Sequence, residues 1–233
     1  MRLLVNGDSH TAGTDAVNGY AFAMDDRKYF NMGRAPHPDN LKASWGLKLA
    51  KMLQAAPLIL AESGSSNDRI LRTTMEYLDM SNSQEDTLLI IQWSTWEREE
   101  WLIDDEWHQI NASGTDYVPE GHREKYMEWV ANIDHVKCEL KWHKRLWLLH
   151  ETLSDRNIKH IFFNGNNKFD HVPPNERKDW GTSYIRPYDS SYDDYLRENG
   201  HKTTHRKGYH FDERAHGAWA RHMMRHILDN KII

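Results

Sequence analysis

The chain has 233 residues, of which 39% are hydrophobic, and this suits one folded domain over residues 1–233 and argues against disorder. Its formal net charge of −5, with acidic and basic residues interleaved, argues against nucleic acid as a partner, because such proteins usually present a basic face. No apolar run is long enough for a membrane span or a secretory signal, and the single cysteine, Cys138, excludes an internal disulfide, so we expect a cytoplasmic protein.

Short apolar stretches and helical spacings alternate along the chain and predict its fold. Apolar runs typical of buried parallel strands lie at residues 3–5, 57–61, 88–93 and 160–163. Apolar residues at helical spacing predict helices over 44–53, 67–80, 122–153 and 212–228. Asp212 is the expected N-cap of the last helix. This order predicts an α/β fold, a flavodoxin-like three-layer α/β/α sandwich with a parallel sheet.

Polar clusters stand where the predicted strands end. "GDSHT" follows the first strand, "ESGSSNDRI" the second and "STWEREEW" the third, while "GYHFDERAHGAWA" opens the last helix. Ligand sites in open α/β sheets form beyond the carboxyl ends of the strands, so we expect these clusters to meet in one site. Two long segments without a periodic pattern, 11–43 and 165–209, are long enough to be functional loops.

Three of these clusters resemble sequence blocks of the SGNH (GDSL-type) hydrolase family. Gly7-Asp8-Ser9 is similar to the first block, Gly64 to the glycine of the second, and the stretch around His210 to the last. The resemblance implies a serine hydrolase acting on a small-molecule or glycan ester, an acetylated sugar for example, without a cofactor. It also implies that Ser9 is the nucleophile, that His210 is the base and that the Gly64 N–H donates to the oxyanion.

The chain departs from the family pattern at two places. The third block usually reads Gly-x-Asn-Asp, whereas this chain has Ser-Thr-Trp-Glu over 94–97, and the Asp expected three residues before the base is Lys207. We expect the N–H groups of Ser9 and Gly64 to hold the oxyanion, with the Asn67 amide as a third donor. A backbone carbonyl could orient His210 in place of the acid. Auxiliary candidates are Asp8, Arg98 and His216, the last as a competing base.

Two other functions fit parts of the sequence. Asp8-x-His10 resembles the opening motif of the metallophosphoesterases, but no Gly-His-x-His follows, and we expect no metal site. A binding or virion-structural module on a degenerate hydrolase fold would tolerate both departures from the SGNH pattern. Trp93, Trp96, Trp101 and Trp107 would suit either a sugar platform beside the site or the filling of a core. Nothing in the sequence indicates an oligomeric state.

Overall fold

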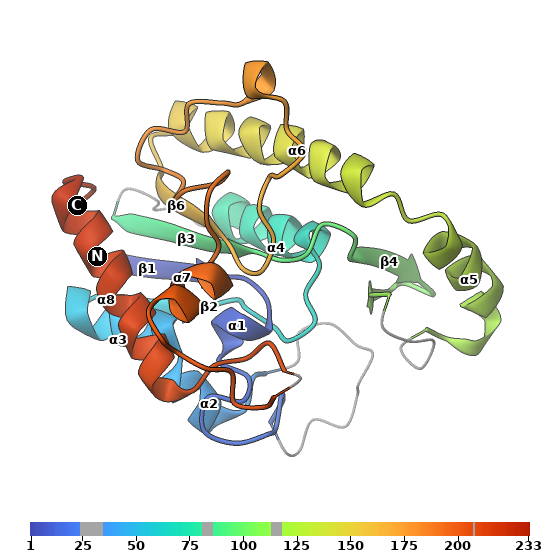
Figure 1. Ribbon diagram of the computed structural model, residues 1–233, viewed down its shortest axis with the longest axis horizontal. Coiled ribbons are helices and arrows are strands. Elements are labelled where there is room, and N and C mark those ends of the chain that lie inside the picture. The colour runs from blue at the N-terminus through green and yellow to red at the C-terminus, as the bar shows by residue number, and fades with distance from the viewer. Residues whose placement is uncertain (24–34, 81–85, 113–117, 207) are drawn as a thin grey trace.

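A parallel sheet forms the centre of the computed structural model, which describes residues 1–23, 35–80, 86–112, 118–206 and 208–233. Its strands run in the order β2-β1-β3-β6 (Figure 1). Their bounds are β1 (Arg2–Asn6), β2 (Ala56–Ile59), β3 (Thr87–Trp93) and β6 (Lys159–Asn164), which confirms the four predicted strands. The order reverses between β1 and β3, and the carboxyl ends of strands at such a point are where open α/β sheets bind ligands.

Helices cover both faces of this sheet (Figure 1). On one face, Leu3 and Val5 pack with residues of α3 (Trp45–Leu53), α7 (Tyr192–Glu198) and α8 (Glu213–Asp229). On the other, Leu4 packs with residues of α4 (Asn67–Met80) and α6 (His135–Asp155). Neighbouring residues of one strand are thus buried on opposite sides, and this is why the strands are apolar without alternation. The predicted three-layer α/β/α sandwich is confirmed.

Three of the four predicted helices are confirmed, and one prediction is wrong. α3, α4 and α8 lie within one residue of their predicted bounds, and the Asp212 side chain caps α8 by accepting the Ala215 N–H. The single helix expected over 122–153 is instead the turn η2 (Glu120–His122), α5 (Arg123–Ala131) and α6. α6 is a separate helix with its own N-cap, Asp134. Its apolar residues pack on the sheet, whereas those of α5 pack in a separate hydrophobic cluster.

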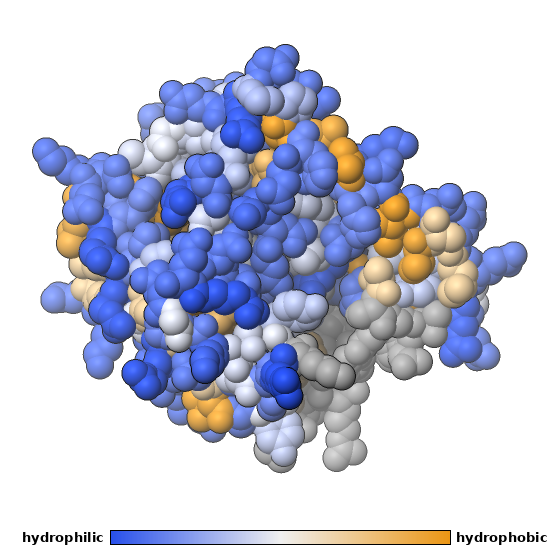
Figure 2. Space-filling view, in the orientation of Figure 1, coloured by the Kyte–Doolittle hydropathy of each residue, from blue (hydrophilic) through white to orange (hydrophobic). Residues whose placement is uncertain are grey.

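A hairpin that the sequence patterns did not predict provides the partner of α5. Strands β4 (Glu99–Ile103) and β5 (Glu106–Ile110) pair antiparallel, and their buried side chains form a small third hydrophobic cluster with α5. The hairpin and α5 project from one side of the sandwich (Figure 1), and Figure 2 shows hydrophobic surface gathered there. Leu102 and Met127 are exposed on these elements.

The remaining short helices lie in segments expected to be irregular or beside them. They are α1 (Ser9–Ala12), α2 (Pro38–Ala43), α7 and the turn η3 (Pro174–Glu176). Across the described ranges, every helix is too short or too polar to cross a bilayer.

Candidate active site

The end of β1 delivers Ser9 to the carboxyl edge of the sheet. The chain passes from Asn6 through Gly7 and Asp8 directly into α1, whose first residue is Ser9. The Gln92 side chain of β3 fixes this turn by accepting the Asp8 N–H at 3.2 Å and the Thr11 hydroxyl at 3.0 Å. A Cβ on Gly7 would lie 2.5 Å from Thr11 Oγ1 and 2.9 Å from Gln92 Oε1, so this close approach requires glycine.

Ser9, His210 and Asp15 form a hydrogen-bonded line. Oγ of Ser9 lies 2.9 Å from Nε2 of His210, and Nδ1 of the same ring lies 2.8 Å from Oδ2 of Asp15. With the ring proton on Nδ1 and donated to Asp15, Nε2 is free to accept the Ser9 hydroxyl proton. The structure therefore places the two residues of the first and last sequence blocks in contact, and it adds a carboxylate behind the imidazole.

The carboxylate of Asp15 occupies the position for which the sequence offered only a backbone carbonyl. Asp15 has φ of 64° and follows the left-handed Gly13, which ends α1. The Glu213 N–H donates to the Ala16 carbonyl at 3.1 Å and so ties this turn to the start of α8, three residues after His210. The only sequence signal was an Asp close behind the serine, in "SHTAGTD"; Lys207, the family's usual acid position, lies outside the described residues.

Two further histidines lie near His210 but have other contacts. His216 is buried, and its Nδ1 accepts the Trp45 N–H at the start of α3 at 3.3 Å. Burial, with the nearby His10 and His210, lowers the pKa of His216 to about 3, so the ring is a neutral acceptor. The ring of His10 packs 5.2 Å from that of His210, between centroids, and burial lowers its pKa to about 4. The δ nitrogen of His216 is thus engaged with α3, which favours His210 over His216 as the base; the role of either histidine stays a prediction.

The loop after β2, which carries Gly64, contacts the turn that precedes Ser9. The Glu62 N–H donates to the Gly7 carbonyl at 3.3 Å, which brings the two loops together. A buried ion pair of 2.9 Å between Glu62 and Arg69 ties the loop to α4. Gly64 has φ of 85°, and among the described residues nothing beyond its chain neighbours would lie within 4 Å of a Cβ there. The second-block glycine thus lies at an open, firmly held turn.

Asn67 does not have the arrangement expected of an oxyanion donor. Its Nδ2 donates to the carbonyls of Ser94 at 3.1 Å and Thr95 at 3.4 Å, and its Oδ1 accepts the Ser94 N–H at 2.7 Å. Both ends of the amide are therefore engaged with the loop after β3, and the side chain is fully buried. These contacts do not support the assignment of Asn67 to the oxyanion, which stays an untested prediction. Nor does Asn67 cap α4, since Ser66 Oγ accepts the Arg69 N–H.

Asp8 and Arg98, two of the auxiliary candidates, form an ion pair next to Ser9. Oδ2 of Asp8 lies 3.2 Å from Arg98 and accepts the Ser94 hydroxyl at 2.8 Å, while Oδ1 accepts the His10 N–H at 3.0 Å. Burial opposes ionisation of this carboxyl, but the charges of His10 and Arg98 and these hydrogen bonds hold its pKa below the ordinary value. The carboxylate and the imidazole of the Asp8-x-His10 motif have separate partners and do not converge as metal ligands would.

Most of the tryptophans at and after the end of β3 are buried in hydrophobic clusters and do not line the site. Trp93 is fully buried, and Trp96 is 5% exposed and stacks on Phe169 with ring centroids 4.7 Å apart. Trp101 is buried in the small cluster with α5, and the guanidinium of Arg72 lies over Trp107 at 4.8 Å. The core-filling alternative is confirmed for Trp93, Trp96 and Trp101.

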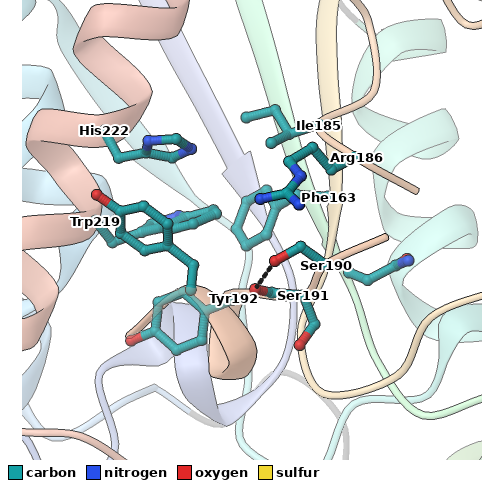
Figure 3. Close-up of a pocket in the computed structure, with 10 residues that line it drawn as sticks. Phe163, Ile185, Arg186, Ser190, Ser191, Tyr192, Trp219 and His222 are labelled. Atoms are coloured by element: carbon teal, nitrogen blue, oxygen red, sulfur yellow. Dashed lines mark hydrogen bonds between the residues drawn. The ribbon is translucent and has the colours of Figure 1, made fainter. Parts of the chain in front are cut away.

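A pocket lies on the face of the sheet that α8 covers (Figure 3). The pocket is lined by the end of β6, by the loop before α7, and by α8. Figure 3 shows Phe163, Arg186 and His222 around it. Tyr192 lines the same pocket, and its ring lies 5.5 Å from that of His10, between centroids. Tyr192 thus contacts both this pocket and His10, the residue after Ser9.

Comparison with known proteins yields structural likeness at low identity. No curated protein matches the chain. It is similar to an acetyl xylan esterase (Est2A) of Butyrivibrio proteoclasticus, with 12% identity, a TM-score of 0.43 and coverage of 98% of this chain and 63% of that one. It is also similar to a carbohydrate esterase family 2 enzyme with a carbohydrate-binding domain from Corynascus thermopiles (Myceliophthora fergusii). Here the identity is 13%, the TM-score is 0.44, and the match covers 98% of this chain and 66% of that one. The chain thus spans less than two thirds of the length of either protein.

A family model covers the middle of the chain. It matches residues 35–159, more than half of the sequence, and it includes Gly64, Asn67 and Arg98. Ser9, Asp15 and His210 lie outside the matched stretch. By this match the chain belongs to DUF6071, a family of unknown function.

Proposed function

We propose that the protein is a serine hydrolase of the SGNH type that cleaves a carboxylic ester, with Ser9 as nucleophile, His210 as base and Asp15 as the acid. The observation that carries this proposal is the line of hydrogen bonds of 2.9 and 2.8 Å through His210. A nucleophile within hydrogen-bond reach of a base, which a third group orients, is the arrangement that activates a serine. Asp15 also weakens the case for a degenerate binding module, since the missing acid was one of the two departures on which that case depended.

The proposed reaction proceeds in two halves. Ser9 Oγ attacks the ester carbonyl carbon, its proton passes to Nε2 of His210, and the carbonyl electron pair moves to the oxygen. When the oxyanion collapses, the C–O bond to the alcohol breaks, and the alcohol leaves with the proton from His210. A water molecule then repeats the sequence on the acyl-serine and releases the carboxylic acid. Asp15 stabilises the imidazolium in both halves, and no step needs a cofactor.

The backbone N–H groups of Ser9 and Gly64 are the proposed donors to the oxyanion. Donors of this kind work best when they do not have to move during the reaction. The hydrogen bonds of Gln92 to the turn before Ser9 and the buried Glu62–Arg69 pair below Gly64 support that role. A small-molecule or glycan ester, such as an acetylated sugar, is the proposed substrate class, by analogy with the SGNH family.

Hydrolysis of short-chain aryl esters and of acetylated oligosaccharides by the purified protein tests the proposal. We expect turnover that Ser9→Ala abolishes. The control is Ser154→Ala, which removes a surface hydroxyl bonded to the His150 carbonyl on α6. An inert wild-type protein, or turnover that survives Ser9→Ala, would overturn the proposal.

A further inference from the structure

A guanidinium lies between the two loops that carry the proposed oxyanion donors. Nη1 of Arg98 donates to Asp8 Oδ2 at 3.2 Å and to the Ser65 carbonyl at 3.4 Å. It also lies 2.8 Å from Ser94 Oγ. Asp8 immediately precedes Ser9, and Ser65 immediately follows Gly64. One nitrogen of Arg98 therefore bridges the neighbours of both proposed donors.

The other nitrogens of this guanidinium have no hydrogen-bond partner among the described residues. In the part of the chain that the structure describes, Nε and Nη2 of Arg98 make no hydrogen bond, and the side chain is 23% exposed. An arginine has five N–H donors, of which Nη1 holds two. The three others are available to a bound molecule at the edge of the site.

The position of this guanidinium is fixed before any substrate binds. Asp8 is 2% exposed and its carboxylate is held by His10 N–H and Ser94 as well as by Arg98. The loop that carries Ser94 is held in turn by the amide of Asn67. A charged donor anchored in this way needs no reorganisation when negative charge develops on a substrate oxygen.

We propose that Arg98 is the third donor to the oxyanion and takes the place of the asparagine that the third block lacks. The inference rests on the proposed hydrolase function. In it, the free N–H groups of Arg98 bond to the carbonyl oxygen as the Ser9 Oγ–C bond forms, while Nη1 stays on Asp8. The competing interpretation is that Arg98 only neutralises the buried carboxylate of Asp8.

Arg98→Lys separates these interpretations, because lysine keeps the positive charge but loses the planar set of additional donors. We expect kcat on an activated ester to fall about 10²-fold, as on removal of one oxyanion donor, with KM changed little. Arg156→Met is the matched control, since it removes an arginine paired with Asp79 at 3.4 Å, far from the carboxyl edge of the sheet, and should leave kcat unchanged. A wild-type kcat in Arg98→Lys would overturn the inference and leave the hydrolase standing.

A boronic acid gives a second readout that a purely structural role would not move. Phenylboronic acid forms a tetrahedral, negatively charged adduct with an active serine, so Arg98→Lys should weaken its inhibition by the same factor as kcat. If the variant does not fold, protection of Arg98 in the wild type from phenylglyoxal by the boronate, located by peptide mass spectrometry, takes its place. Modification of Arg98 at equal rates with and without boronate would overturn the inference. A wild type without esterase activity would overturn the hydrolase and the role of Arg98 together.

Discussion

The two sides of Ser9 are built differently. On one side, His210 and Asp15 come from segments 195 residues apart in sequence, and their side chains are 24% and 17% exposed. On the other side, the Asp8 side chain is 3% exposed and is tied to the turn after β3 by Ser94 and Arg98. The side with His210 and Asp15 is partly exposed to solvent. The side with Asp8 is a buried cluster held together by hydrogen bonds and an ion pair.

This difference corresponds to two chemical tasks. Groups that transfer a proton change their charge during each catalytic turnover, and contact with solvent lowers the free-energy cost of that change. Groups that position a nucleophile and its oxyanion donors have to stay in one place, which buried and fully bonded groups do. Substitutions on the proton-transfer side should therefore reduce turnover with little loss of stability, and substitutions on the anchored side should affect both.

The largest effect is expected at the histidines. His210→Ala removes the proposed base and should lower kcat/KM by about 10³-fold or more, with the melting temperature close to that of the wild type. His216→Asn is the matched comparison, since it keeps an acceptor for the Trp45 N–H and should leave most of the activity. Steady-state kinetics and thermal melts of both variants check this. Equal activities in the two variants would mean that His210 is not the base.

Asp15→Asn should have the next largest effect. The amide still bonds to the imidazole but no longer stabilises its positive charge, and it can donate to Nδ1 and favour the wrong tautomer. We expect kcat to fall on the order of 10²–10⁴-fold with KM nearly constant. The control is Asp212→Asn, which retains an N-cap for α8 and should be close to wild type. A kcat for Asp15→Asn within a factor of two of the wild type would contradict the role of Asp15.

Gly7→Ala tests the anchored side. Its methyl group would collide with Thr11 Oγ1 and Gln92 Oε1, so the turn before Ser9 has to shift. We expect a loss of stability of about 1–3 kcal/mol together with a fall in kcat, measured by chemical denaturation and ester turnover. Gly121→Ala is the control, because a Cβ there meets no described residue. Wild-type stability in Gly7→Ala would contradict the close approach.

The smallest effect concerns pH and stability. Burial lowers the pKa of His216 to about 3 and that of His10 to about 4, against an ordinary value of 6.5. The unfolded chain therefore binds more protons than the folded one between pH 6.5 and these values, so stability falls as the pH falls through this range. His216→Asn should make the fall in melting temperature from pH 7 to pH 4.5 less steep. An unchanged slope would mean that His216 does not contribute to it.

Local patterns predicted the sandwich because its strands and helices are specified by apolar runs and periodicity. The hairpin escaped prediction because its turn is Asp104-Asp105, with φ of 50° and 63°, where glycine or asparagine is the usual signal. Its strands do show alternation, with Trp101 and Ile103 buried and Leu102 exposed. That the chain forms one domain stays a prediction.

A residue of the candidate site could be predicted from the sequence when a single local motif identifies it. Ser9 and His210 follow from motifs, and their hydrogen bond agrees with the roles expected of them, which stay predictions. Asp15 and Asn67 depend on contacts between distant segments, and no local pattern reports which partner a carboxylate or an amide finds. Asn67 is engaged by a backbone 27 residues away, and Asp15 by a ring 195 residues away.

The central claim is that Ser9 is an activated nucleophile. Incubation of the wild-type protein with a fluorophosphonate, followed by peptide mass spectrometry, tests it most directly, because such reagents phosphonylate serines that a base activates, with loss of fluoride. We predict one adduct, on Ser9, which is absent from Ser9→Ala and slowed in His210→Ala and Asp15→Asn. An unlabelled protein, or an adduct on a serine other than Ser9, would contradict the account.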